Sequence, residues 1–185
     1  MNIYEKGLSL IESAMALVVS AAVTAGVMLY YQTASDSNKT QSAMAEIMNI
    51  AAFINGLYTG QTSYKGLSDS ILLNTPAISD NYKDRDKINN PFGGRVTIGT
   101  YDSNAGYYIK LTEINRYACI NLATLNMGSS AAGYGVNVLD SDIARINDFT
   151  LSVGSNGTKK IPFTPSESND QCKNERDNNV VFFLK

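Results

Sequence analysis

The residue most capable of unusual chemistry is Glu12, a carboxylate inside a long apolar run. The run covers Leu8–Tyr31, and Glu12 is its only charge. A helix over these 24 residues is about 36 Å long, enough to cross a bilayer core of about 30 Å. An ionised carboxylate near the centre of such a span costs about 2.5–3.5 kcal/mol, so by default it indicates a function. The alternative is a glutamate that reaches the lipid headgroups of a plain signal anchor.

Cys119 and Cys172 are the second set of reactive side chains. They are too far apart in the sequence to form a CxxC redox motif or a zinc knuckle. A domain exported behind an N-terminal membrane span folds in an oxidising compartment, where such a pair usually bonds. The pair therefore favours a disulfide, and two unpaired buried thiols are the alternative.

Composition excludes several classes of chemistry. The chain has no histidine, which removes Ser-His-Asp triads, Cys-His pairs and histidine-ligated metal sites. Its 15 Lys and Arg against 17 Asp and Glu give a net charge of −2, without a long basic run, so no footprint for nucleic acid is expected. We predict no catalytic residue, cofactor or metal site, and an enzyme is the weakest functional interpretation.

A single long helix must position Glu12. After a polar stretch the apolar periodicity resumes and predicts one amphipathic face. Gly56 and Gly60 indicate where the helix ends. The helix is expected from about residue 8 to about residue 58, apolar all round in its first half and amphipathic in its second. The face of the second half consists of Met44, Ile47, Met48, Ala51 and Ile54.

The rest of the chain predicts a mixed α+β domain. Residues 59–90 are expected to form a long loop with one helical turn, and the charged string 80–87 a solvated face; a calcium loop there is the minor alternative. Alternating apolar residues predict a hairpin from 95–101 and 106–112. A helix is expected from residue 116 to a stop at Gly128, with strands at 134–138 and 180–185.

The start of the chain resembles the processing site of type IV prepilins. Gly7, a hydrophobic Leu8 and a glutamate five residues into the mature chain are the residues that carry this resemblance. It implies that a prepilin peptidase cleaves the Gly7–Leu8 bond and methylates the amine of Leu8. It also implies that Glu12 of one subunit neutralises the Leu8 amine of a neighbour during assembly. Leucine rather than phenylalanine at the mature start points to the type IVb class.

Further stretches are similar to the bundlin family of type IVb pilins. They include SLIESAM, INGLYTGQTSY, NPFGG, CINLATLN and GYGVNV, whereas 139–166 match poorly. The resemblance implies a type IV pilin fold, in which a long N-terminal helix packs on an antiparallel sheet beside a disulfide-bounded C-terminal region. The expected segments are a leader (1–7), a transmembrane or fibre-core half-helix (8–31), an amphipathic half-helix (32–58) and a globular head (59–185).

The resemblance also implies the partners and the location of the protein. A homopolymeric pilus is expected, drawn from the inner membrane by an assembly machinery and displayed on a Gram-negative cell surface for adherence and bacterial aggregation. Contact with a host-cell surface is a further implied partner. Two alternatives stay open: a minor pilin or type II secretion pseudopilin, and a membrane-anchored monomeric binding module.

Overall fold

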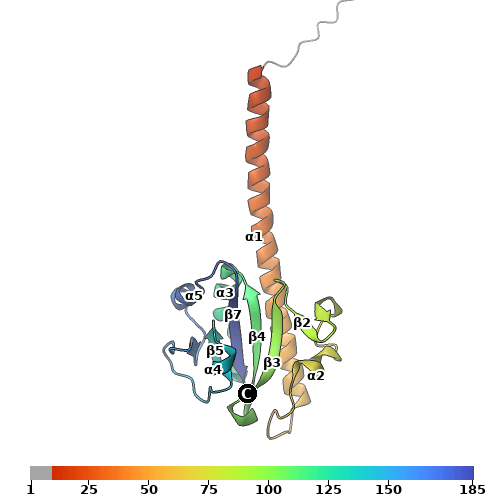
Figure 1. The fold of residues 1–185 in the computed structure, drawn as a ribbon, viewed down its shortest axis with the longest axis vertical. Coiled ribbons are helices and arrows are strands. Elements are labelled where there is room, and N and C mark those ends of the chain that lie inside the picture. The colour runs from red at the N-terminus through yellow and green to blue at the C-terminus, as the bar shows by residue number, and fades with distance from the viewer. Residues whose placement is uncertain (1–9) are drawn as a thin grey trace, which may run out of the picture. The chain divides into compact units, whose positions relative to one another are not determined.

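The computed structural model describes residues 10–185, so Gly7 and Leu8 lie outside the described residues. Its first element is the helix α1 (Leu10–Leu57), which contains 48 residues and appears in red to orange in Figure 1. The prediction of one continuous helix is confirmed, with its end one residue before the expected position. The chain divides into two compact units with a boundary between Ser37 and Asn38, inside α1. Each unit is described by itself below.

The first unit is the N-terminal part of α1. Its large apolar side chains are exposed, from Val23 at 60% to Leu10 at 89%. The hydroxyls of Ser20, Thr24 and Thr33 donate to the carbonyl four residues earlier in the helix. These side chains are therefore satisfied within the helix, as an apolar surrounding requires.

The second unit begins with residues 38–57 of α1, which place one face in the hydrophobic core. Ala43, Ile47, Ile50 and Ile54 are fully buried. The prediction placed Met48 on this face and was wrong, because Met48 is 47% exposed. The buried face centres on Ile47 and Ile54. Met48 directly follows Ile47 and is therefore turned about 100° away from the centre of that face.

A seven-stranded antiparallel sheet forms the body of the second unit. Its spatial order is β1-β2-β3-β4-β7-β5-β6, so the C-terminal strand lies between β4 and β5. The strands are β1 (Lys83–Asp84), β2 (Lys87–Asn89), β3 (Arg95–Tyr101), β4 (Gly106–Ile114), β5 (Ala131–Val136), β6 (Thr158–Lys159) and β7 (Asn178–Leu184). Both outermost strands have two residues, which leaves little unpaired edge for association with other chains.

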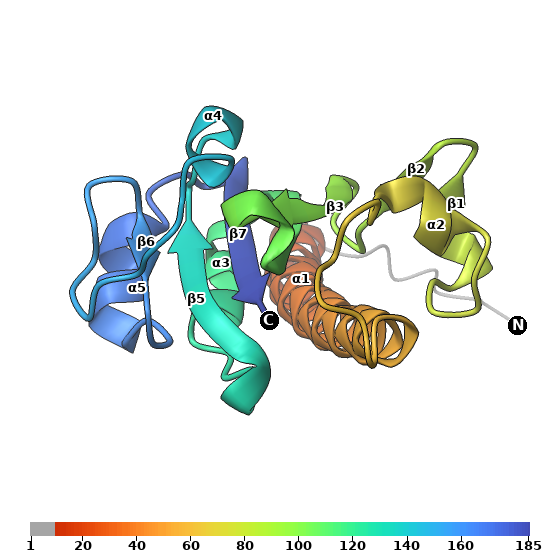
Figure 2. The ribbon, with the colours of Figure 1, turned by 90° about the horizontal axis from the view of Figure 1, so that it is seen from below.

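The two faces of the sheet are covered differently. Alternate residues of a strand point to opposite faces, and on β7 Phe182 joins the main core with α1 while Phe183 joins a smaller cluster. The smaller cluster is formed with Val138, Ile143 and Ile146, which lie around the helix α4 (Asp140–Ile143). Figure 2 shows α4 on the opposite side of the sheet from the orange part of α1.

Short helices connect the strands. They are α2 (Asp69–Leu73), α3 (Arg116–Ala123) and α5 (Pro165–Gln171), with single 3-10 turns η1 (Asp80–Tyr82), η2 (Asp102–Asn104) and η3 (Gly128–Ser130). The single helical turn expected in 59–90 corresponds to α2, and the expected hairpin is β3–β4, paired in register from Val96 with Leu111 to Tyr101 with Gly106.

Two expectations about connections were wrong. The helix expected to stop at Gly128 ends at Ala123, whose carbonyl accepts a hydrogen bond from the backbone N–H of Phe163, 3.1 Å away. Phe163 lies far from Ala123 in the sequence, so the local sequence does not predict this end of the helix. The long loop expected in 59–90 contains a small hairpin, because Lys83 pairs with Ile88 and Asp84 with Lys87. No residue of the charged string 80–87 is buried, so its prediction as a solvated face is confirmed.

Candidate functional site

Glu12 lies in the first turn of α1, and its side chain is exposed. A carboxylate in this position interacts favourably with the positive end of the helix dipole. The predicted partners in its chemistry, Gly7 and Leu8, lie outside the described residues, so the proposed scissile bond stays a prediction. Among the described residues, Glu12 lies on the exposed surface of a continuous helix.

The surface around Glu12 is apolar over several turns of helix. By length and composition α1 can cross a membrane, and its most apolar window is not buried by any described part of the chain. An exposed apolar surface of this size on a protein marks an interaction site with lipid or with other chains. The exposed residues are Leu10, Ile11, Met15, Leu17, Val18, Val19, Val23, Val27, Met28, Leu29, Tyr30 and Tyr31.

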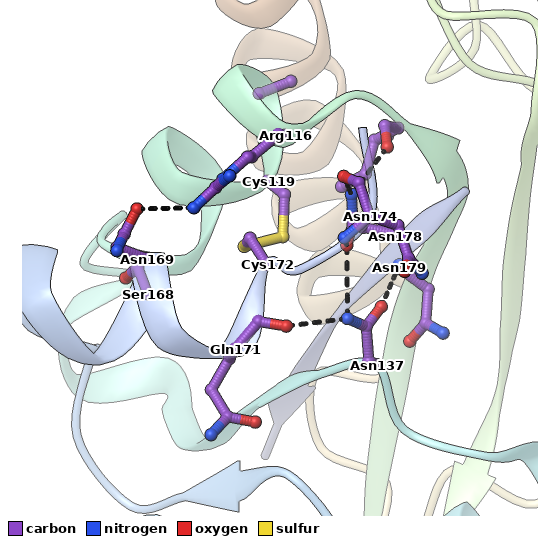
Figure 3. Close-up of a disulfide and its surroundings, with 12 residues drawn as sticks. Arg116, Cys119, Asn137, Ser168, Asn169, Gln171, Cys172, Asn174, Asn178 and Asn179 are labelled. Atoms are coloured by element: carbon purple, nitrogen blue, oxygen red, sulfur yellow. Dashed lines mark hydrogen bonds between the residues drawn. A yellow bond between two sulfur atoms is a disulfide. The ribbon is translucent and has the colours of Figure 1, made fainter. Parts of the chain in front are cut away.

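The two cysteines form a disulfide, as the sequence favoured. Cys119 lies on α3 and Cys172 directly follows α5, with their Cα atoms 5.9 Å apart (Figure 3). Both residues are fully buried. The bond closes a loop across a separation of 53 residues, which contains β5, α4, β6 and α5. Residues 139–166, which match the stretches of the bundlin family poorly, lie inside this loop.

Two lysines of the sheet form ion pairs with carboxylates of the disulfide-bounded region. Lys110 of β4 donates to the carbonyl of Val138 at 3.0 Å and to Asp140 Oδ1 at 2.7 Å. Lys159 of β6 donates to both carboxylate oxygens of Glu167, at 2.8 and 2.7 Å. The Lys159 ammonium, followed by hydrogen bonds from Thr164, lowers the pKa of Glu167 to about 2. The same carboxylate completes the capping box at the start of α5.

Sequence reasoning missed one unusual residue, Glu46. It lies on α1 beside the buried face, is only 7% exposed, and neither carboxylate oxygen has a hydrogen-bond partner among the described residues. Burial raises the pKa of Glu46 to about 7, because removal from water disfavours the charged form. Its position about 100° from Ile47 around the helix was the available signal. The helical periodicity alone did not indicate that Glu46, at the side of the buried face, is buried as well.

The fold defines the class of the protein. The chain superposes on TcpA, a type IV pilin from the Vibrio cholerae El Tor biotype, with a TM-score of 0.56. The match covers 80% of this chain and 99% of the solved TcpA chain at 17% sequence identity, which establishes a shared fold. The predicted architecture, a type IV pilin fold with a long N-terminal helix, an antiparallel sheet and a C-terminal disulfide, is confirmed.

Sequence comparison then gives the family. The bundlin family model matches residues 32–182. Two proteins, each named major structural subunit of bundle-forming pilus, are 54% identical to this chain over 187 aligned positions; they come from Escherichia coli O111:H- and from Escherichia coli O127:H6 (strain E2348/69 / EPEC). Each alignment covers 98% of this chain and 95% of the relative. The chain belongs to the bundlin family.

Proposed function

We propose that this chain is the major structural subunit of a type IVb pilus. The observation that carries the proposal is the 54% identity over 98% of the chain with two major subunits of bundle-forming pili. The exposed apolar surface of α1 supports it, because a polymer of such helices buries in its centre what the single chain leaves exposed. On this account the function is structural, and the partner of each subunit is a further copy of the same chain.

The chain then divides by role. Residues 1–7 act as the leader and 8–31 as the membrane span before assembly and the fibre core afterwards. Residues 32–58 connect this span to the head through the buried face of α1, and 59–185 form the head. The continuous helix from Leu10 to Leu57 supports this division, because it joins the apolar half to the half with the buried face.

Processing assigns roles to three residues. Prepilin peptidase cleaves after Gly7 and methylates Leu8, which precedes Glu12 by four positions in the sequence. In the fibre, Glu12 of one subunit neutralises the Leu8 amine of a neighbour. An uncompensated charge in an apolar fibre core carries a strong penalty, so this pairing selects one axial register.

The location follows from the same account. The precursor resides in the inner membrane of a Gram-negative cell until an assembly machinery extracts it into an extracellular pilus. The fibre promotes bacterial aggregation and adherence, with the head exposed to host-cell surfaces. The disulfide between Cys119 and Cys172 suits a head that folds outside the cytoplasm.

Fibres sheared from cells that express the chain test this proposal. We expect this chain to be the predominant protein of the sheared fraction, and deletion of its gene to remove the fibres. A trace amount in fibres built from another subunit would assign it as a minor pilin or pseudopilin. Complete retention in the membrane would assign it as an anchored monomeric module.

A further inference from the structure

Arg116 joins the two segments that carry the cysteines. It is the first residue of α3, three positions before Cys119. Its Nη2 donates to Asn169 Oδ1 at 2.9 Å, and its backbone N–H donates to the carbonyl of Glu175 at 3.2 Å (Figure 3). Asn169 and Glu175 lie three residues before and three residues after Cys172. One arginine therefore holds the chain on both sides of the second cysteine.

Asn137 holds the same segment from the sheet. Its Nδ2 donates to the carbonyl of Gln171, the residue before Cys172, at 2.9 Å (Figure 3). Its Oδ1 accepts from the backbone N–H of Asn179 at 2.9 Å, and its own N–H donates to the carbonyl of Asn179. Asn137 has a left-handed backbone with φ of 54°, which asparagine tolerates better than most residues. Asn137 is thus anchored on β7 through Asn179, and its side-chain N–H holds the residue that precedes Cys172.

Asn178 completes this arrangement inside the protein. It is 1% exposed, and its Nδ2 donates to the carbonyls of Ile114 and Asn174. Its Oδ1 accepts from Asn137 Nδ2 at 3.2 Å and from the backbone N–H of Asn174 at 3.3 Å. Asn178 is buried with its amide bonded on both sides, whereas Asn137 is half-buried. A buried polar group whose bonds are all satisfied favours one geometry. The contacts around Cys172 therefore form a defined frame that does not itself include the disulfide.

We propose that Asn137 and Arg116 are positioning residues for oxidation of Cys119 and Cys172. They act on the Cys172 segment, residues 165–177, and hold it against α3 in the reduced chain. This raises the effective concentration of one thiol at the other, so that disulfide formation follows folding of the sheet. Neither residue touches a sulfur in a reacting role; each acts through the backbone that carries Cys172.

The reaction needs an external disulfide as oxidant. The thiolate of one cysteine attacks the oxidant and forms a mixed disulfide, releasing one thiol of the oxidant. The thiolate of the other cysteine then attacks the protein sulfur of that mixed disulfide and releases the second thiol. Two electrons pass from the two cysteines to the oxidant, and their two protons end on its thiols. The frame affects the second step, which requires the two protein sulfurs to meet.

The test measures the redox equilibrium of the full-length chain in detergent micelles. The protein is equilibrated in mixtures of reduced and oxidised glutathione, quenched by alkylation, and the disulfide fraction is counted by mass. Asn137→Gly keeps the left-handed backbone accessible and removes the amide. We expect it to lower the effective concentration of the cysteine pair by about fivefold, the equivalent of the hydrogen bond to Gln171, which is the one of its three side-chain bonds that reaches the Cys172 segment.

Asn104→Gly is the matched control. Asn104 is also left-handed, with φ of 71°, and its Oδ1 accepts from Thr100 Oγ1 at 2.8 Å. It lies beside the Tyr101–Gly106 end of the sheet, whereas Asn137 lies beside the Asn179 end of β7. In the Asn104→Gly variant we expect the effective concentration of the cysteine pair to stay within about twofold of the value in the parent chain, because distant sites act independently. A general loss of fold stability would lower the effective concentration in this variant as well, so the comparison separates such a loss from a local role of Asn137.

Arg116→Gln provides a second test should Asn137→Gly fail to fold. It removes the side-chain bond to Asn169 and keeps the backbone bond to Glu175, so we expect a decrease of about threefold. An effective concentration equal to that of the parent chain in each variant that folds would overturn the proposal. A decrease of the same size in Asn104→Gly would also overturn it, because the effect would then be a general loss of stability.

Discussion

The two parts of α1 differ in how their apolar side chains are covered. In residues 38–57 the chain buries its own apolar face, with Ile47, Ile50 and Ile54 fully inaccessible. In residues 10–37 the apolar side chains stay exposed, Ile11 at 70% among them. Hydrophobic burial stabilises a structure only where water is removed. The second part therefore contributes to the stability of the head, whereas the exposed apolar side chains of the first part gain no such burial from the described chain.

Loss of the disulfide gives the largest expected effect, and it is confined to the head. Cys119→Ser opens a loop closed across 53 residues, which the chain-entropy model values at about 4 kcal/mol. We expect this loss in the free energy of unfolding, measured by urea titration of the full chain in micelles. Tyrosine fluorescence reports the transition, since the chain has 11 tyrosines and no tryptophan. Membrane insertion should stay normal, and an unchanged free energy of unfolding would refute the role of the bond.

A matched pair of isoleucine truncations compares the two parts of α1 directly. Ile50→Ala removes a fully buried side chain from the core, and we expect it to lower the free energy of unfolding by about 3 kcal/mol. Ile11→Ala removes the same atoms from an exposed position, and its effect should stay below about 0.5 kcal/mol. Equal losses in the two variants would contradict the division between the parts of the helix.

Glu46 makes the stability of the head depend on pH. Its pKa is raised from the model-peptide value of 4.5 to about 7 in the folded chain, so folding favours the protonated acid. The stability from this group is present below about pH 4.5, falls as the pH rises toward 7, and is absent above 7. We expect Glu46→Gln to be more stable than the parent chain by about 2 kcal/mol at pH 8 and nearly equal at pH 4.

The difference between the two chains isolates Glu46 from other titrating groups. Glu167 acts in the opposite direction, because its pKa is lowered to about 2 and its contribution is lost only as the pH falls from 4.5. It is present in both chains and cancels in the comparison. A constant difference between Glu46→Gln and the parent chain from pH 4 to pH 8 would show that burial of the carboxylate carries no penalty.

Glu12→Val has the smallest expected effect on the head and a large one on the fibre. Glu12 is exposed in the first turn of α1, so the free energy of unfolding of the head should change by less than about 0.5 kcal/mol. Membrane insertion should persist, while the yield of sheared fibres should fall sharply, because on the proposed pairing the Leu8 amine loses its counter-charge. A normal fibre yield would remove Glu12 from assembly.

Gly7 offers a separate test of processing. Its replacement by a bulky residue such as phenylalanine should leave full-length precursor in the membrane, with the stability of the head unchanged. Immunoblots of membrane and sheared fractions check this outcome. Mature protein in normal amounts would show that cleavage does not depend on Gly7.

Local pattern predicted those elements whose periodicity is strong. The apolar run up to Tyr31, the amphipathic continuation and the β3–β4 hairpin all follow from spacing alone. Long-range contacts determined the rest. The end of α3 depends on Phe163, and β7 pairs with both β4 and β5, which lie at least 42 residues earlier in the chain. No local sequence signal encodes such partners.

The candidate site divides in the same way. The composition and the export argument favoured the disulfide, and the structure contains it. The frame around it was not predicted, because Asn137, Arg116 and Asn178 are ordinary surface-type residues until the fold brings them to Cys172. Glu46 was missed for a related reason, since its burial depends on what covers the flank of the helix.

Intact mass spectrometry of sheared fibres tests the central claim most directly. The account predicts one predominant species that begins at methylated Leu8 and is two hydrogens lighter than the reduced chain. Such a mass would establish cleavage after Gly7, methylation, the disulfide and polymerisation in one spectrum. Sheared fractions without the chain, together with uncleaved precursor in the membrane, would contradict the account.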